Sequence, residues 1–223
     1  MKLLERITVL LVSTWLLGCH TGIAATLYTE PLGASAQYPA ALASWQYVGI
    51  RFELDQPAQL TALHAEMGDS PSSFFAALVQ LPSVTSLPQG NPFAQGEVLY
   101  STIFNLDWDF MKLWDIPFTV SVDPGAYAII FGAGQFGSSG YISAVAGTYN
   151  SVPASTGFVW VPDSPAPLAP WHDTPSITFN VSVEGTLVPE PSSVTFVFVG
   201  LLTLRVWRMI PRKVLRLPMT ADT

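Results

Sequence analysis

The feature that most constrains the fold of this chain is a strict alternation of apolar and polar residues in short segments. In residues 48–55 (VGIRFELD) the four even-numbered positions are apolar and fall on one face of an extended chain. Arg51, Glu53 and Asp55 fall on the opposite face. The pattern recurs in residues 118–122 and 177–183. It predicts β-strands with one face in the core and a polar face, Arg51 included, toward solvent.

Other apolar segments predict further strands at residues 60–67, 74–81, 98–103, 126–131, 141–145 and 158–161. Turn-forming residues separate them, at positions 55–57, 88–92, 123–125 and 162–170. The apolar run 74–79 is interpreted as a buried strand, with a helix as the alternative. Many short strands without a long helical pattern predict an all-β body at residues 26–187, an antiparallel β-sandwich of jelly-roll-like form.

The charge of the predicted body is strongly one-sided. Between Thr26 and Leu187 there are 13 acidic residues and only two basic ones, Arg51 and Lys112, for a net charge of −11. Such a surface repels a phosphate backbone, so nucleic acid is excluded as a partner.

Residues 1–25 are predicted to form a secretory signal peptide, with a signal helix. Lys2 and Arg6 precede the apolar segment 7–18 (ITVLLVSTWLLG), which is too short to cross a bilayer but suits the apolar region of such a signal. Small residues follow, and cleavage by signal peptidase is expected after Ala25. As an alternative, Leu16-Leu17-Gly18-Cys19 resembles a bacterial lipobox, in which Cys19 would carry lipid. Both interpretations export the chain.

The C-terminal segment combines three features in order. Residues 188–193 (VPEPSS) are proline-rich, residues 194–204 (VTFVFVGLLTL) are apolar, and a basic cluster follows, made up of Arg205, Arg208, Arg212, Lys213 and Arg216. The prolines keep the first part extended. The apolar part predicts a transmembrane helix, and the basic cluster predicts a cytoplasmic orientation for its end. Residues 217–223 form a short tail.

This order of features in residues 188–216 resembles the PEP-CTERM sorting signal of Gram-negative bacteria. The resemblance implies that a membrane-embedded exosortase recognises the motif Val188, Pro189, Glu190, Pro191 and Ser192 and processes the tail. It also implies passage through an inner-membrane intermediate to the outer surface or the exopolysaccharide matrix. An ordinary tail anchor behind a proline-rich stalk is the alternative, because hydropathy alone does not separate the two.

The segment 105–115 (NLDWDFMKLWD) is the strongest candidate for ligand contact in the body. If it is extended, Trp108 and Phe110 share one face, and Asp107 and Asp109 share the other. Trp108 and Trp114 are candidates for stacking on sugar rings. Asp107, Asp109 and Asp115 offer oxygen ligands for calcium, but the spacing of an EF-hand is missing. Burial of both tryptophans as packing residues is the third interpretation.

The sequence gives little support for catalysis. Residues 132–137 (GAGQFG) fit GxGxxG, but no helical pattern follows, so a glycine-rich loop between two strands is predicted. His64 and Glu66 share one face of a strand, and a surface hydrogen-bonded pair is expected there rather than a metal site. His172-Asp173 is the other histidine-containing candidate. No metal site or cofactor is assigned.

These features predict an exported, non-enzymatic protein of the cell surface or exopolysaccharide matrix. A secreted carbohydrate-binding module is the first alternative. A secreted hydrolase is the second, and it would require acidic residues to converge with His64 or His172 in one pocket.

Overall fold

The computed structural model describes residues 25–29, 40–68, 71–108, 111–149, 156–162, 170–174 and 177–188. Within these ranges every regular element is a β-strand, and the strand pairings are antiparallel. None of the described residues forms a helix long and apolar enough to cross a membrane. One compact unit ends at Val188, and a second comprises Pro189–Thr223. The predicted signal helix and transmembrane helix lie outside the described residues.

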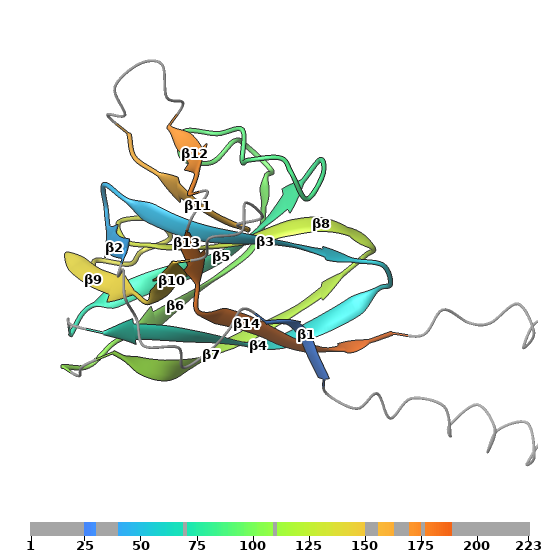
Figure 1. Cartoon of the computed structure of the whole chain (residues 1–223), viewed down its shortest axis with the longest axis horizontal. Coiled ribbons are helices and arrows are strands. Elements are labelled where there is room, and N and C mark those ends of the chain that lie inside the picture. The colour runs from blue at the N-terminus through green and yellow to red at the C-terminus, as the bar shows by residue number, and fades with distance from the viewer. Residues whose placement is uncertain are drawn as a thin grey trace, which may run out of the picture. The chain divides into compact units, whose positions relative to one another are not determined.

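The strands lie in two six-stranded sheets and one short ribbon (Figure 1). Their bounds are β1 Ala25–Thr29, β2 Ala40–Ala43, β3 Tyr47–Leu54, β4 Ala58–Gly68, β5 Ser73–Leu81, β6 Val98–Asn105, β7 Lys112–Val122, β8 Gly125–Gly132, β9 Ile142–Val145, β10 Gly147–Tyr149, β11 Gly157–Trp160, β12 Trp171–Asp173, β13 Ile177–Phe179 and β14 Val181–Leu187. The first sheet has the order β12-β11-β3-β8-β5-β6. The second has the order β1-β14-β4-β9-β2, with β7 also paired to β4, and β10 pairs with β13.

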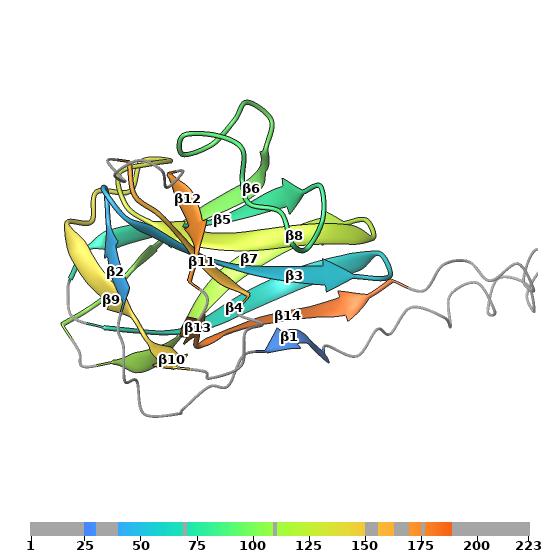
Figure 2. The same ribbon diagram turned by 45° about the horizontal axis from the view of Figure 1, so that its top comes forward.

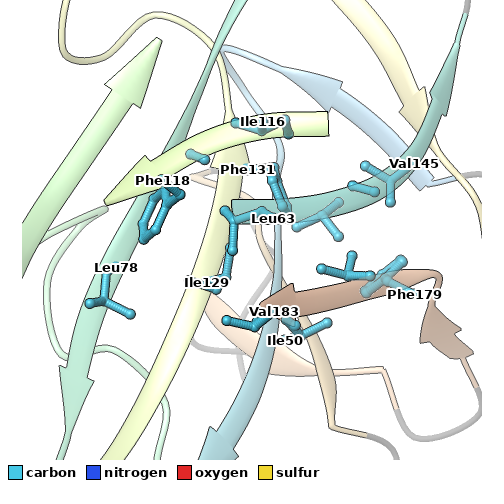
Figure 3. Packing of buried hydrophobic residues seen from close by; sticks show 14 of the residues in the cluster. Ile50, Leu63, Leu78, Ile116, Phe118, Ile129, Phe131, Val145, Phe179 and Val183 are labelled. Atoms are coloured by element: carbon cyan, nitrogen blue, oxygen red, sulfur yellow. The ribbon is translucent and has the colours of Figure 1, made fainter. Parts of the chain in front are cut away.

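The two larger sheets pack face to face as a β-sandwich, and Figure 2 shows their layers from a second direction. Alternate residues of β3, β5 and β8 meet apolar residues of β4, β7 and β14 between the sheets. Figure 3 shows this core, with Ile50, Leu78 and Ile129 from one sheet and Leu63, Phe118 and Val183 from the other. The expected all-β body with antiparallel sheets is therefore confirmed.

Each predicted strand coincides with an observed one except at residues 177–183, which were expected to form a single strand. The segment breaks at Asn180, so that β13 pairs with β10 while β14 pairs with β4. The fully buried Asn180 donates from Nδ2 to Glu66 Oε2 at 2.8 Å and from its backbone N–H to the carbonyl of Ala146 at 3.0 Å. These bonds satisfy a polar residue in the interior where the chain changes partner.

A second apolar cluster lies on the outer face of the first sheet. On β5, Phe74, Ala76 and Leu78 face the core between the sheets, whereas Phe75, Ala77 and Val79 belong to the outer cluster. The predicted buried strand at residues 74–79 is confirmed, and the structure shows that it is buried on both faces. The long connection from β5 to β6, residues 82–97, covers this outer face and packs Val84, Leu87 and Phe93 against it.

Burial of the outer face corrects the expected exposure of Arg51. Glu53 and Asp55 are exposed as predicted, but Arg51 is buried. Its Nη2 atom lies 2.7 Å from Asp173 Oδ1, and its Nη1 donates to the carbonyl oxygen of Thr85 at 3.2 Å. The guanidinium also lies over the ring of Phe158, 5.6 Å from its centroid. Partners remote in sequence thus make a charged side chain tolerable in the interior.

Candidate functional sites

His64 bridges three neighbouring strands on the outward face of the second sheet. Its Nδ1 atom lies 2.6 Å from Oδ1 of Asp115 on β7, the residue directly opposite in register. Its Nε2 atom lies 3.0 Å from Oε1 of Glu184 on β14. The two atoms are within ion-pair distance, but their geometry does not meet the criteria for a hydrogen bond. Burial lowers the pKa of His64, but the two carboxylates outweigh it, so the pKa is raised.

This geometry makes His64 a cross-link between strands and leaves neither of its ring nitrogens free to act as a general base. A base needs a ring nitrogen directed at a substrate proton, whereas both nitrogens of His64 meet carboxylates. The expected pair with Glu66 is replaced by separate partners, because the Glu66 carboxylate accepts from Asn180. His172 lies on β12 of the other sheet, opposite Val159, so the two histidines of the body occupy different sheets.

Trp108 and Trp114, the two candidates for sugar contact, lie in different surroundings. Trp114, on β7, is half-buried and donates its Nε1–H to the carbonyl oxygen of Met67 at 2.9 Å. The Lys112 ammonium lies over its ring at 4.2 Å from the centroid. Trp108 lies in the connection between β6 and β7 and is 78% exposed. Trp114 is thus held as a packing residue, and Trp108 presents its ring to solvent.

The oxygen donors proposed for calcium are not assembled in the described residues. Asp115 is bonded to His64, Asp107 is exposed in the loop, and Asp109 lies outside the described residues. No group of three metal-ligating side chains is found in the part of the chain that the structure describes.

The glycine-rich segment 132–137 is a connection between strands, as predicted. Gly132 ends β8, and the chain reaches β9 at Ile142 without forming a helix. Phe136 has a φ of 55°, a left-handed conformation that is uncommon for a residue other than glycine. Its ring packs edge-on against Phe75 and tilted against Phe93, with centroid distances of 5.1 and 5.7 Å. These contacts hold Phe136 in place while leaving it 40% exposed.

The connection 82–97 is fastened by buried tryptophans and one carboxylate. Trp171 donates its Nε1–H to the carbonyl oxygens of Gly90 and Pro92, at 3.0 and 2.8 Å, and Trp160 donates to the side-chain oxygen of Asn91. Within the loop, the Glu97 carboxylate accepts hydrogen bonds from the backbone N–H groups of residues 89, 90 and 94. This loop is therefore an integral part of the outer face.

Exposed aromatic residues outside the segment 105–115 were not singled out from the sequence. Trp45, in the turn between β2 and β3, is 48% exposed, and Tyr141, just before β9, is 81% exposed. Together with Phe136 they lie in loops, where turn residues mask any periodic pattern. The sequence signal that could have marked them is an isolated aromatic residue next to serine, glutamine or glycine.

Most of the residues assigned to sorting fall outside the described residues. These are Cys19, Pro189, Glu190, Pro191, Ser192 and the basic residues from Arg205 onward. Ala25 opens β1, where it pairs with Gly185 of β14. Val188 is exposed, and its backbone N–H donates to the carbonyl oxygen of Pro57 at 2.7 Å.

Comparison with known proteins gives no family. No family model matches the chain, and no curated protein matches it. Two matching solved structures are the infectious bursal disease virus Gx strain and a mutant VP2 protein of that virus in T=1 particles. The first is 9% identical over 85% of this chain and 49% of that chain, with a TM-score of 0.26. The second is 10% identical over 76% and 46%, with a TM-score of 0.24. The chain spans about half the length of these structures, and likenesses this low carry no functional argument.

Proposed function

We propose that this chain is an exported, non-enzymatic β-sandwich protein of the cell surface or exopolysaccharide matrix, sorted by an exosortase through residues 188–192. The observation that carries the proposal is the sequence order VPEPSS, apolar segment and basic cluster, placed behind a body that follows a secretory signal. In the proposed route, signal peptidase removes residues 1–25. The C-terminal helix then holds the chain in the inner membrane, with Arg205, Arg208, Arg212 and Lys213 on the cytoplasmic side.

The placement of the strands at the two ends of the body is compatible with this route. β1 starts at Ala25 and lies antiparallel to β14, which ends at Leu187. The strands therefore occupy the interval between the two proposed processing segments. Cleavage after Ala25 would remove the first residue of β1 with its pairing to Gly185, and would leave residues 26–29 to pair with β14.

A jelly-roll topology for the body is part of the proposal. The orders β1-β14-β4-β7 and β3-β8-β5-β6 support it, because the strands connect the two sheets in the manner of two Greek keys. This topology brings the first and last strands side by side.

The test is replacement of Pro189 and Pro191 by alanine in the full chain. Export across the inner membrane should be unaffected, but the double variant should remain in the inner membrane instead of reaching the outer surface. The matched control replaces the exposed prolines Pro117 and Pro124, which lie in the body, by alanine. Delivery of the Pro189/Pro191 variant to the surface at the wild-type level would refute exosortase sorting.

The mass of the mature protein separates the processing alternatives. Exosortase processing predicts loss of the tail beyond the motif, whereas a tail anchor predicts a retained C-terminus. The same measurement distinguishes cleavage after Ala25 from lipidation at Cys19, because the latter adds acyl chains to a longer chain.

A further inference from the structure

Four connections converge at one end of the sandwich. Antiparallel pairing places the start of β3 beside the end of β8, and the start of β5 beside the ends of β8 and β6. In the second sheet, the end of β4 lies beside the start of β7 and the end of β9. The connections β2–β3, β4–β5, β6–β7 and β8–β9 therefore share this end, which lies at the left of Figure 1.

Contacts between the connections show that they form one surface. The Leu106 backbone N–H donates to the carbonyl oxygen of Ser72, and the Gly140 N–H donates to that of Ser73. The β6–β7 and β8–β9 connections thus both attach to the start of β5. A side chain added at Gly134 would meet Ser44, which places the β8–β9 connection against the β2–β3 turn as well.

Four exposed aromatic residues occur on this surface, at least one on each of three connections. They are Trp45, Trp108, Phe136 and Tyr141, and we call this surface the aromatic end. The chain enters and leaves the body at the opposite end, because Leu187 pairs with Ala58 beside the β3–β4 turn and Ala25 pairs with Gly185. The aromatic end is therefore remote from both attachment points of the body, as the right side of Figure 1 shows for β14.

The exposed rings have polar residues one or two positions before them in the sequence. Asp107 precedes Trp108 in the sequence, Gln135 precedes Phe136, and Ser139 lies two residues before Tyr141. Asp107 and Ser139 are both exposed. Exposed rings with polar residues close by in the chain suit a sugar polymer, which presents both C–H faces and hydroxyl groups. Burying the exposed carboxylate of Asp107 in a hydrocarbon phase would be costly.

The charges around the aromatic end favour a neutral sugar polymer over an acidic one. Arg51 and Lys112 are the only lysine or arginine residues in the described part of the chain. Arg51 is buried against Asp173, and the Lys112 ammonium lies over Trp114. An acidic polymer would therefore meet a surface with Asp107 exposed and no cluster of cations to neutralise it.

We infer that the aromatic end is a binding site for a neutral polysaccharide, with Trp108 as the principal stacking residue and Trp45 and Tyr141 extending the contact along the glycan. Phe136 is the anchored member, because its ring packs on Phe75 and Phe93. The inference builds on the proposed function, which places the body outside the cell, where such polymers occur. The site faces away from the end at which the proposed sorting signal leaves the body.

The test is affinity electrophoresis of the purified full chain in nonionic detergent. The probes are three soluble neutral glucans (hydroxyethylcellulose, laminarin and dextran) and the acidic polymer polygalacturonate, each with and without chelator. At least one neutral glucan should retard the protein regardless of chelator. Trp108→Ala should weaken that binding about tenfold, the loss typical of an interface anchor. Trp45→Ala combined with Tyr141→Ala should weaken it further.

The matched control is Leu99→Ala, which removes an exposed apolar side chain of β6 outside the aromatic end. It should bind as the wild type does, and unchanged unfolding midpoints should show that all variants fold. Lack of retardation by all three glucans, equal binding by Trp108→Ala, or binding only to polygalacturonate would overturn the inference. Because binding is measured on purified protein, the result of this test does not depend on the result of the sorting experiment.

Discussion

Arg51 and Asp173 form a 2.7 Å ion pair that joins strands 122 residues apart in the sequence. The guanidinium is buried, whereas about half of the Asp173 side chain is exposed. Arg51 also binds the carbonyl oxygen of Thr85 in the connection that covers the outer face. One side chain therefore ties together β3, β12 and residues 82–97.

The asymmetric exposure of this pair leads to the first prediction. Asp173→Ala leaves a buried cation without its carboxylate, so it should reduce the free energy of unfolding by about 2–3 kcal/mol despite the exposure of Asp173. Exposed Glu53→Ala, on the same strand as Arg51, should change it by less than about 0.5 kcal/mol. Urea unfolding of the full chain in detergent measures both. Equally small losses from Asp173→Ala and Glu53→Ala would show that the burial of Arg51 does not depend on the Asp173 carboxylate.

The core between the sheets gives the second prediction. Phe52 is buried and packs in tilted contacts with Tyr28 and Tyr127, at centroid distances of 5.7 and 5.9 Å. Phe52→Ala should therefore lower the free energy of unfolding by about 3–5 kcal/mol, the usual cost of removing a buried aromatic ring. Phe52→Leu, which fills most of the cavity, should lose clearly less. A loss from Phe52→Ala no larger than that from Glu53→Ala would contradict the strand register.

The alternation in the sequence predicts which residues of β3 face the core between the sheets. It does not predict what packs against the opposite face of the strand. The pattern 48–55 predicts burial of Ile50 and Phe52, and both are buried. The same pattern suggests a solvated face for Arg51, because nothing local shows that Phe158 and Asp173 arrive from more than 100 residues away. Burial of a second face depends on long-range packing, which a period-two pattern does not encode.

The candidate ligand residues show the same limit. Trp108 and Trp114 are close in sequence, yet one lies in a loop and the other is fixed by a bond to Met67 of the neighbouring strand. Trp45 and Tyr141 are distant in sequence, yet their connections meet at one end of the sandwich. Turn residues predict loops individually, but only the strand order shows which loops converge.

The third prediction concerns the connection 82–97. The Glu97 carboxylate accepts three backbone N–H groups in the loop, at 2.6, 2.8 and 3.3 Å. Glu97→Ala leaves these donors without that acceptor and should speed amide hydrogen exchange at residues 89, 90 and 94. Exchange in β8 should be unchanged, because that strand retains its sheet bonds. Uniform acceleration throughout the body would instead indicate global destabilisation.

The last prediction concerns pH. Burial opposes protonation of His64, but Asp115 and Glu184 outweigh it, so the folded-state pKa lies above the unfolded value near 6.5. A raised pKa means that the folded state holds the proton more tightly. The stabilisation is therefore complete below about pH 6.5 and is lost as the pH rises through the folded-state pKa. Above that point the neutral imidazole no longer attracts both carboxylates.

Stability measured by urea unfolding should accordingly fall as the pH rises through the range in which His64 titrates. His64→Gln should remove this contribution to the slope while keeping a side chain that can donate a hydrogen bond. His172→Gln, on the other sheet, is the matched control and should retain the contribution of His64. Asp115→Asn should reduce the slope in part, because Glu184 still faces Nε2. A slope that is the same in wild type and His64→Gln would show that the carboxylates do not hold this proton in the folded protein.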